Sequence, residues 1–237
     1  MTKLLLILAS LLALSGPLQG EPIEFAGMAI PGLLEADGSG AYYKVFKAVA
    51  ADSGLEVNLT VMPVARAIHE YNIGNYLGLF PGTLSITTLP TLASIPFNQV
   101  KLLIFSSHNS QTIGSLSDLK GLRVGRVRGV KYPNTVNESP GIVTFVKDEQ
   151  QNIKMLMAGR IGAFFGLVPD VYLALESLKL TYPLAVNKSK SYMGVDDTFM
   201  LTDTPLHNEY IKKINRVIKN MKASGKLKKM LGKAYVE

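Results

Sequence analysis

Residues that could hold a small charged molecule occur where predicted strands end. Arg128 follows an apolar strand predicted over residues 122–127, and Lys131 lies in the same loop. A guanidinium can make two parallel hydrogen bonds to a carboxylate, sulfonate or phosphate. Arg66 lies near the start of a predicted helix, where free backbone N–H groups also favour an anion. These side chains predict anion binding; the alternatives are a surface arginine for Arg128 and an ordinary salt bridge for Arg66.

Aromatic, hydroxyl and carboxylate side chains follow other predicted strands. Tyr42 comes after a glycine-rich turn, where it could stack on a ligand or pack into the core. Phe80, Thr83 and Ser85 follow the third strand and would suit an apolar pocket with few polar anchors. Asp170 opens a helix and could bind an ammonium group or stabilise the helix N-terminus.

Few residues could perform catalysis or hold a metal ion. The chain has no cysteine, its three histidines are isolated, and no carboxylate pairing completes a metal set. The segment Gly121–Gly125 lacks both the glycine spacing and the Lys-Ser/Thr pair of a phosphate loop, and no nucleophile-elbow motif is present. The sequence therefore predicts a protein that is not an enzyme and that uses no cofactor or metal.

These candidates need elements to position them. Short apolar runs alternate with helical stretches, a pattern typical of α/β units around mostly parallel sheets. Strands are predicted over residues 22–28, 55–62, 76–80, 99–107, 122–127, 141–146, 161–165 and 181–186. Helices are predicted over residues 41–53, 64–73, 148–158, 168–177 and 206–221, followed by a short basic helix.

Function in such sheets tends to lie at the carboxyl ends of the strands, where the chain turns into loops. Those loops cover residues 28–40, 80–88, 128–140 and 166–170. If the two sets of α/β units form separate lobes, the loops face each other across a cleft.

The first twenty residues indicate export. A basic start is followed by an apolar run over residues 4–14 and a break at Ser15–Pro17, which is typical of a signal peptide covering residues 1–20. The run of about 11 residues is short for a bilayer, although an uncleaved anchor is the alternative. A periplasmic protein is expected.

The net charge of +7 belongs mostly to one end of the chain. Residues 205–237 contain nine Lys or Arg against two Glu, whereas residues 21–204 hold fifteen basic and sixteen acidic residues. Nucleic-acid binding is not predicted, because export removes the usual partner and no aromatic residues are interleaved for base stacking. The basic segment is a solvated helix face or a docking surface for an acidic partner or anionic lipid.

Four segments carry a recognisable pattern. Residues Ser115–Gly125 fit S-L-x-D-L-K-G-x-x-V-G, and residues 157–163 read M-A-G-R-I-G-A, similar to a G-R-I-D-A motif. Residues Pro63–Ala67 with Gly74–Tyr76 are similar to a P-x-x-R-A helix leading to G-x-Y-D, and the tail over residues 208–227 has a helix-Gly-helix ending. In this order, across nearly the whole exported chain, the segments resemble the bacterial extracellular solute-binding proteins of family 3.

The resemblance implies an α/β, two-lobed periplasmic binding protein-like fold of type II, with mixed sheets flanked by helices and a cleft between the lobes. Residues 21–107 and 190–237 would form the first lobe and residues 108–189 the second, with crossings near 106–109 and 187–192. Such folds close on a ligand by hinge motion. The implied function is capture of a small polar solute for the permease of an ABC transporter, by a monomeric protein.

Departures from the family pattern bear on the solute. Leu77 and Gly162 stand where the family has acidic residues, and residues 87–91 contain no arginine to clamp an α-carboxylate. A small anionic or zwitterionic solute other than a standard amino acid is therefore expected. Two other functions stay open: a ligand-sensing module for a membrane receptor, and an enzyme of the periplasmic dehydratase kind recruited from the same fold.

Overall fold

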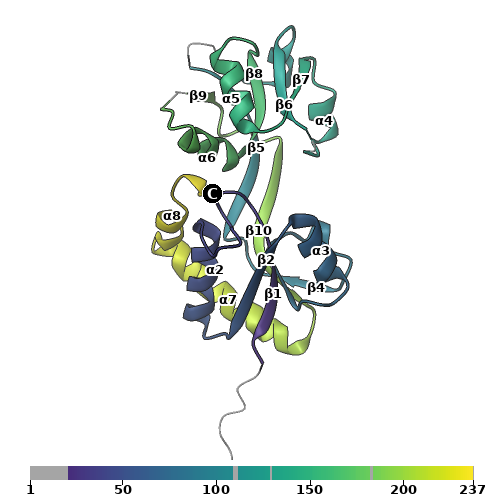
Figure 1. Ribbon diagram of the computed structural model, residues 1–237, viewed down its shortest axis with the longest axis vertical. Coiled ribbons are helices and arrows are strands. Elements are labelled where there is room, and N and C mark those ends of the chain that lie inside the picture. Colours follow the sequence, from purple (N-terminus) through teal and green to yellow (C-terminus); the bar gives the residue numbers. More distant parts are fainter. Residues whose placement is uncertain (1–20, 109–111, 129, 182–183, 237) are drawn as a thin grey trace, which may run out of the picture.

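Two lobes joined by two long strands make up the molecule (Figure 1). The computed structural model describes residues 21–108, 112–128, 130–181 and 184–236, so the predicted signal peptide lies outside the described residues. The joining strands are β5 (Asn98–Ser107) and β10 (Met193–Thr202), which run side by side and antiparallel between the lobes.

The first lobe is built on three parallel strands. These are β1 (Ile23–Met28), β2 (Val57–Met62) and β3 (Gly78–Gly82), with β1 in the middle. The lobe half of β10 pairs antiparallel with β3, and the short β4 (Thr91–Ala93) pairs with β10. A 3-10 turn, η2 (Leu84–Ile86), follows β3.

Four helices cover this sheet: α2 (Ala41–Ser53), α3 (Val64–Asn72), α7 (Pro205–Ala223) and α8 (Lys226–Leu231). Helix α2 begins after Gly40, whose φ of 98° and lack of a side chain are both required, because a Cβ would lie 2.2 Å from the Leu33 carbonyl oxygen. Helix α7 begins with a Thr204 cap and Pro205 in its first turn, and its apolar face is buried. Five of the nine basic residues noted above are exposed on its outward face, and the other four lie in α8 and the turn after it.

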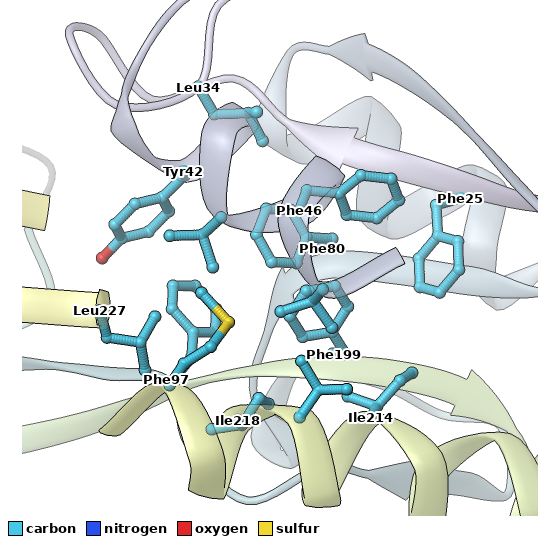
Figure 2. Close-up of a cluster of buried hydrophobic side chains, with 14 of the residues drawn as sticks. Phe25, Leu34, Tyr42, Phe46, Phe80, Phe97, Phe199, Ile214, Ile218 and Leu227 are labelled. Atoms are coloured by element: carbon cyan, nitrogen blue, oxygen red, sulfur yellow. The ribbon is translucent and has the colours of Figure 1, made fainter. Parts of the chain in front are cut away.

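An aromatic cluster forms the core between α2, α7 and the first sheet (Figure 2). Phe80 on β3 lies 4.6 Å from Phe199 of β10 and 5.1 Å from Phe46 of α2, measured between ring centroids. Phe97, just before β5, stacks on Phe80 at 5.3 Å. Rings from α2, from β3 and β10, and from the residue before β5 therefore pack together where the chain leaves the first lobe.

The second lobe repeats the α/β pattern. Its sheet contains β6 (Arg123–Val127), β7 (Ile142–Val146), β8 (Ala163–Val168) and β9 (Leu184–Val186), and β6 pairs parallel with both β7 and β8. Strand β5 runs antiparallel to β8 and β9. The helices are α4 (Asn134–Asn137), α5 (Glu149–Met157) and α6 (Asp170–Ser177), and a 3-10 turn, η3 (Leu116–Leu119), precedes β6. A last 3-10 turn, η4 (Gly232–Ala234), follows α8, and its Ala234 packs in the core of the first lobe.

The two halves form one curled sheet of order β2-β1-β3-β10-β5-β8-β6-β7. The predicted α/β architecture with mixed sheets and flanking helices is confirmed, whereas the predicted boundaries of the lobes stay a prediction. Strand β10 was not anticipated; its central residues are Asp196 and Asp197, which interrupt the apolar pattern of a buried strand. Within the described part of the chain, no helix has the length and apolar character needed to cross a membrane.

Candidate ligand-binding cleft between the lobes

A cavity of about 710 Å³ lies between the lobes, at the carboxyl ends of β1, β6, β7 and β8. Its size suits a small organic solute. Among the described residues, the first lobe contributes the loop Ile30–Gly32 to its wall, and the second lobe contributes the rest. Those second-lobe residues are Val127, Val130, Lys147, Asp148, Glu149, Gln150, Leu167, Asp170, Leu173, Ala174, Glu176 and Ser177.

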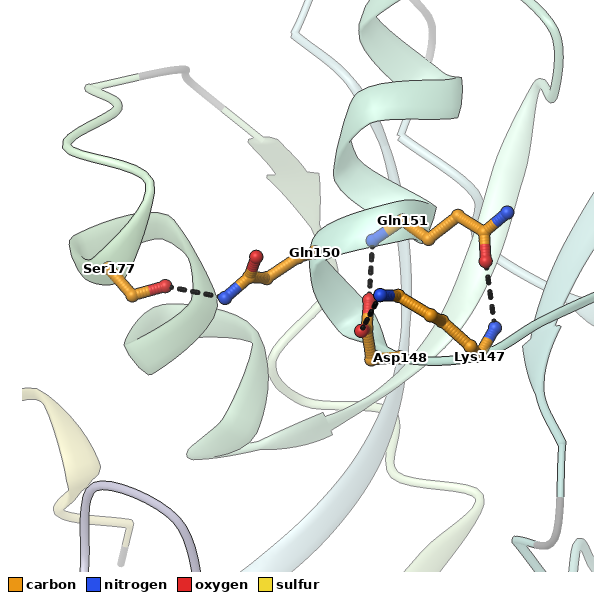
Figure 3. A network of polar contacts seen from close by, with 5 residues as sticks. All are labelled: Lys147, Asp148, Gln150, Gln151 and Ser177. Carbon is orange, nitrogen blue, oxygen red and sulfur yellow. Dashed lines mark hydrogen bonds and ion pairs between the residues drawn. The ribbon is translucent and has the colours of Figure 1, made fainter.

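Residues 147–150, at the N-terminus of α5, form the polar rim of this cavity. Figure 3 shows the polar contacts that Lys147, Asp148 and Gln150 make with their neighbours. Asp148 caps the helix, since its Oδ1 accepts a hydrogen bond from the Gln151 backbone N–H at 2.8 Å. The Gln151 side chain in turn accepts from the Lys147 backbone N–H at 2.8 Å, and Lys147 Nζ lies 3.5 Å from Asp148 Oδ2. Gln150 donates to the Ser177 hydroxyl at 2.8 Å, which ties α5 to α6.

Replacing Asp148 with alanine should lower the free energy of unfolding by about 1 kcal/mol, because the cap on α5 is lost. Urea denaturation followed by circular dichroism measures the change. Asp148→Asn is the matched control: it keeps an oxygen that can accept from Gln151 and should stay within about 0.5 kcal/mol of the wild type. Equal destabilisation by both substitutions would contradict a capping role.

Glu149 is a buried carboxyl on the wall. Its Oε2 accepts from the Asn152 side-chain amide at 2.8 Å and its Oε1 from the Leu167 backbone N–H at 3.3 Å. Burial is the main cause that raises its pKa, to about 7, and the neighbouring charges of Asp170 and Asp148 act in the same direction. The two hydrogen bonds favour the ionised form but do not outweigh burial.

Asp170 lines the same cavity, at the first position of α6 and one residue beyond Pro169, which follows β8. It is partly exposed, and its carboxylate accepts no hydrogen bond from any residue within the described segments. Burial raises its pKa to about 6. Its charge also acts in the direction that raises the pKa of Glu149, after the larger effect of burial.

A third buried carboxyl, Asp197, lies where β10 passes between the lobes. Tyr42 donates its hydroxyl hydrogen to Asp197 Oδ2 at 2.5 Å and accepts from the Asn98 side-chain amide at 2.8 Å. Asn98 also accepts from the Val236 backbone N–H at 2.8 Å, so the C-terminal segment joins the network. Burial raises the pKa of Asp197 to about 7, against the lowering effect of the Tyr42 hydrogen bond.

Of the residues selected from the sequence, the structure places Asp170 on the cavity wall. Tyr42 and Phe80 are fully buried in the aromatic core. Arg66 is exposed on α3 and lies 3.7 Å from Glu70, as in an ordinary salt bridge. Tyr42, Phe80 and Arg66 are not among the described residues that line the cavity with Asp170. Their roles in ligand binding remain predictions.

The other selected residues flank the cavity or lie apart from it. Arg128 and Lys131 are exposed, whereas Val127 and Val130 beside them line the wall. The other two belong to the turn after β3: the half-buried Thr83 and the exposed Ser85. Neither is among the described residues that line the cavity. Ligand contact by these four remains a prediction.

Sequence reasoning missed the polar rim over residues 147–150. A signal for it existed, because the rule that ligands bind at the carboxyl ends of parallel strands applies equally to the strand predicted over residues 141–146. The segment after that strand reads Lys-Asp-Glu-Gln, and its helical spacing predicts only the start of the helix over residues 148–158. Within the described residues, no group of three or more His, Asp or Glu is placed to hold a metal ion.

Solved structures show which fold this is. The L-cystine solute receptor of Neisseria gonorrhoeae in its unliganded open form has a TM-score of 0.70 at 16% identity, covering 90% of this chain and 92% of that one. Substrate-binding domain 2 of GlnP from Lactococcus lactis, also open, has a TM-score of 0.67 at 18% identity, covering 92% and 96%. An ancestral cationic amino-acid solute-binding protein has a TM-score of 0.69 at 17% identity, covering 91% and 96%.

No model of a known protein family matches the sequence, and no curated protein matches it. The likeness is thus one of structure at low identity, and it extends over nearly the whole length of each chain compared. Together with the two lobes and the interlobe cavity, it assigns the chain the two-lobed fold of periplasmic solute-binding proteins.

Proposed function

We propose that this protein captures a small solute in the cleft between its lobes. The observation that carries the proposal is the cavity of about 710 Å³, whose walls come from both lobes. A ligand that contacts both walls favours the closed arrangement over the open one, because it binds the two states with different affinity. Binding and closure need no chemical step, so the proposed role is that of a binding protein and not an enzyme.

The delivery step and the compartment belong to the same proposal. The sequence pattern of residues 1–20 supports export to the periplasm, and the segments described above support a divergent member of family 3. The similar solved proteins include an L-cystine receptor and the substrate-binding domain of GlnP, which support delivery of the captured solute to an ABC-type permease. The anionic or zwitterionic solute favoured by the sequence has no support in the charges of the cavity wall. The described lining residues include one lysine and four acidic residues: Asp148, Glu149, Asp170 and Glu176.

Thermal-shift screening of the chain without residues 1–20 against a broad solute library tests this function. A solute present at about 100 times its Kd should add about 2.7 kcal/mol to the free energy of unfolding. For a chain of this size, that corresponds to a rise in Tm of roughly 5 to 10 °C.

Val130→Trp is the control for the place of binding, because the half-buried Val130 lines the cavity and a larger ring would fill it. Solutes bound in the cleft should stabilise the wild type and leave this variant unchanged. A complete absence of shifts across the library would overturn the proposed function, and chemical conversion of a bound solute would overturn its non-enzymatic character.

A further inference from the structure

The charges on the cavity wall are unbalanced. Among the described lining residues there is one basic side chain, Lys147, against four acidic ones. Lys147 is already paired with Asp148, and Asp148 also caps α5, so these two largely neutralise each other. Glu176 is exposed at the edge. The charges that remain are those of Glu149 and Asp170.

These two carboxyls have no cationic partner in the part of the chain that the structure describes. The hydrogen-bond donors to Glu149 are the neutral amide of Asn152 and the backbone N–H of Leu167. Asp170 accepts no hydrogen bond from described residues, and it lines the same cavity as Glu149. Glu149 is buried and Asp170 is partly buried. Charged groups removed from water are normally paired, so a cation in the cavity would supply the partner that both carboxyls lack among the described residues.

The rest of the wall is apolar. Ile30 and Pro31 face the cavity from the first lobe, and Val127, Val130, Leu167 and Leu173 face it from the second. A ligand that fills this space therefore needs a hydrocarbon or aromatic body as well as a group that satisfies the two carboxyls.

We propose that the solute is an organic cation, an amine or guanidinium compound with an apolar body and no carboxylate, held through Asp170 and Glu149. The inference rests on the proposed function and names the substrate class of the same cleft. An ammonium or guanidinium group supplies the missing counter-charge and donates charge-assisted hydrogen bonds to carboxylate oxygens. A carboxylate on the same solute would meet two like charges and only Lys147, which is already paired.

The competing cation for an anionic solute is Arg128. It follows β6, as predicted from the sequence, but its side chain is exposed and it is not among the described residues that line the cavity. Substitutions at Arg128 and Asp170 therefore separate the two classes of solute, because an anionic group would depend on the first and a cationic group on the second.

Matched pairs that differ only in a carboxylate provide the first test. Agmatine with L-arginine, cadaverine with L-lysine and phenethylamine with L-phenylalanine would be titrated calorimetrically at about pH 8, above the pKa of about 6 of Asp170. The amine of at least one pair should bind with a Kd lower by about tenfold or more than that of its amino acid. Equal or tighter binding of the amino acid in every pair, or binding of L-glutamate in place of the amines, would overturn the inference.

Variants supply the second test, with the tightest amine as the probe. Asp170→Asn should weaken its binding by about tenfold or more, Asp170→Glu should restore part of the loss, and Arg128→Gln should leave the Kd within about twofold. Circular dichroism confirms that each variant is folded. Weakening by Arg128→Gln but not by Asp170→Asn would contradict the assignment.

The failures of the two proposals are distinguishable. If neutral or anionic solutes shift Tm and amines do not, the substrate class is wrong and the binding function stands. If neither the amines nor any other solute in the library binds, both proposals fall.

Discussion

Replacing Phe80 with alanine should lower the free energy of unfolding by about 4 kcal/mol. The Phe80 side chain is fully buried, and its ring lies within 5.3 Å, between centroids, of the rings of Phe46, Phe97 and Phe199. Alanine removes the ring and leaves a cavity that the surrounding elements cannot close completely, because β3, β10 and β5 are held in place by strand pairing. Chemical denaturation measures the loss, and Tm should fall by roughly 10 °C.

Phe145→Ala is the matched control for this prediction. Phe145 undergoes the same chemical change, but it is 58% exposed on β7, at the end of the strand order. Its substitution should cost less than about 1 kcal/mol. Equal costs at the two positions would contradict the view that the aromatic cluster of the first lobe is a main source of stability.

Much of the fold could be predicted because its elements follow periodicity. Apolar residues at helical spacing predict a helix over residues 41–53, and the structure has α2 at Ala41–Ser53. The break at Ser224–Gly225 likewise separates α7 from α8, since Gly225 adopts a φ of 71°, which favours glycine. Where hydrophobic spacing and a turn signal agree, local sequence is sufficient.

Strand β10 could not be predicted in the same way. Its sequence contains Asp196 and Asp197 side by side, and an aspartate pair is unfavourable in a buried strand. The structure shows that Asp196 is exposed and bonded to Gln99, whereas Asp197 is buried against Tyr42. The partner of Asp197 is 155 residues away, so its burial is a tertiary effect that no local pattern records.

The position of the site was easier to predict than its charge. The strand-end rule directs attention to the ends of β6 and β8 and the loops after them, and Val127, Val130 and Asp170 from these segments line the cavity. It does not say which side chains of a loop point into the cavity. Val127 lines the cavity, whereas the next residue, Arg128, is exposed. Because neighbouring side chains of a strand point to opposite sides, an error of one residue in the predicted register changes this part of the wall from apolar to basic.

The second large effect is expected at Asp197. Burial raises its pKa from 3.8 to about 7, so the folded chain holds a proton that the unfolded chain releases at lower pH. The stabilisation that comes from protonated Asp197 in the folded chain is therefore fully present below about pH 4, and it is lost as the pH rises to about 7. Asp197→Asn removes this ionisation and keeps an oxygen that can accept from the Tyr42 hydroxyl.

At about pH 8 the Asp197→Asn variant should consequently be more stable than the wild type by about 2 to 4 kcal/mol, with no gain at about pH 4. Urea denaturation at several pH values measures the free energy of unfolding as a function of pH for the variant and for the wild type. Asp196→Asn makes the same change at the exposed neighbour and should follow the wild type. Parallel curves for Asp197→Asn and the wild type would show that the proton is not held at Asp197. Convergence at low pH with separation at high pH is the result that burial of this carboxyl at the junction of the lobes requires.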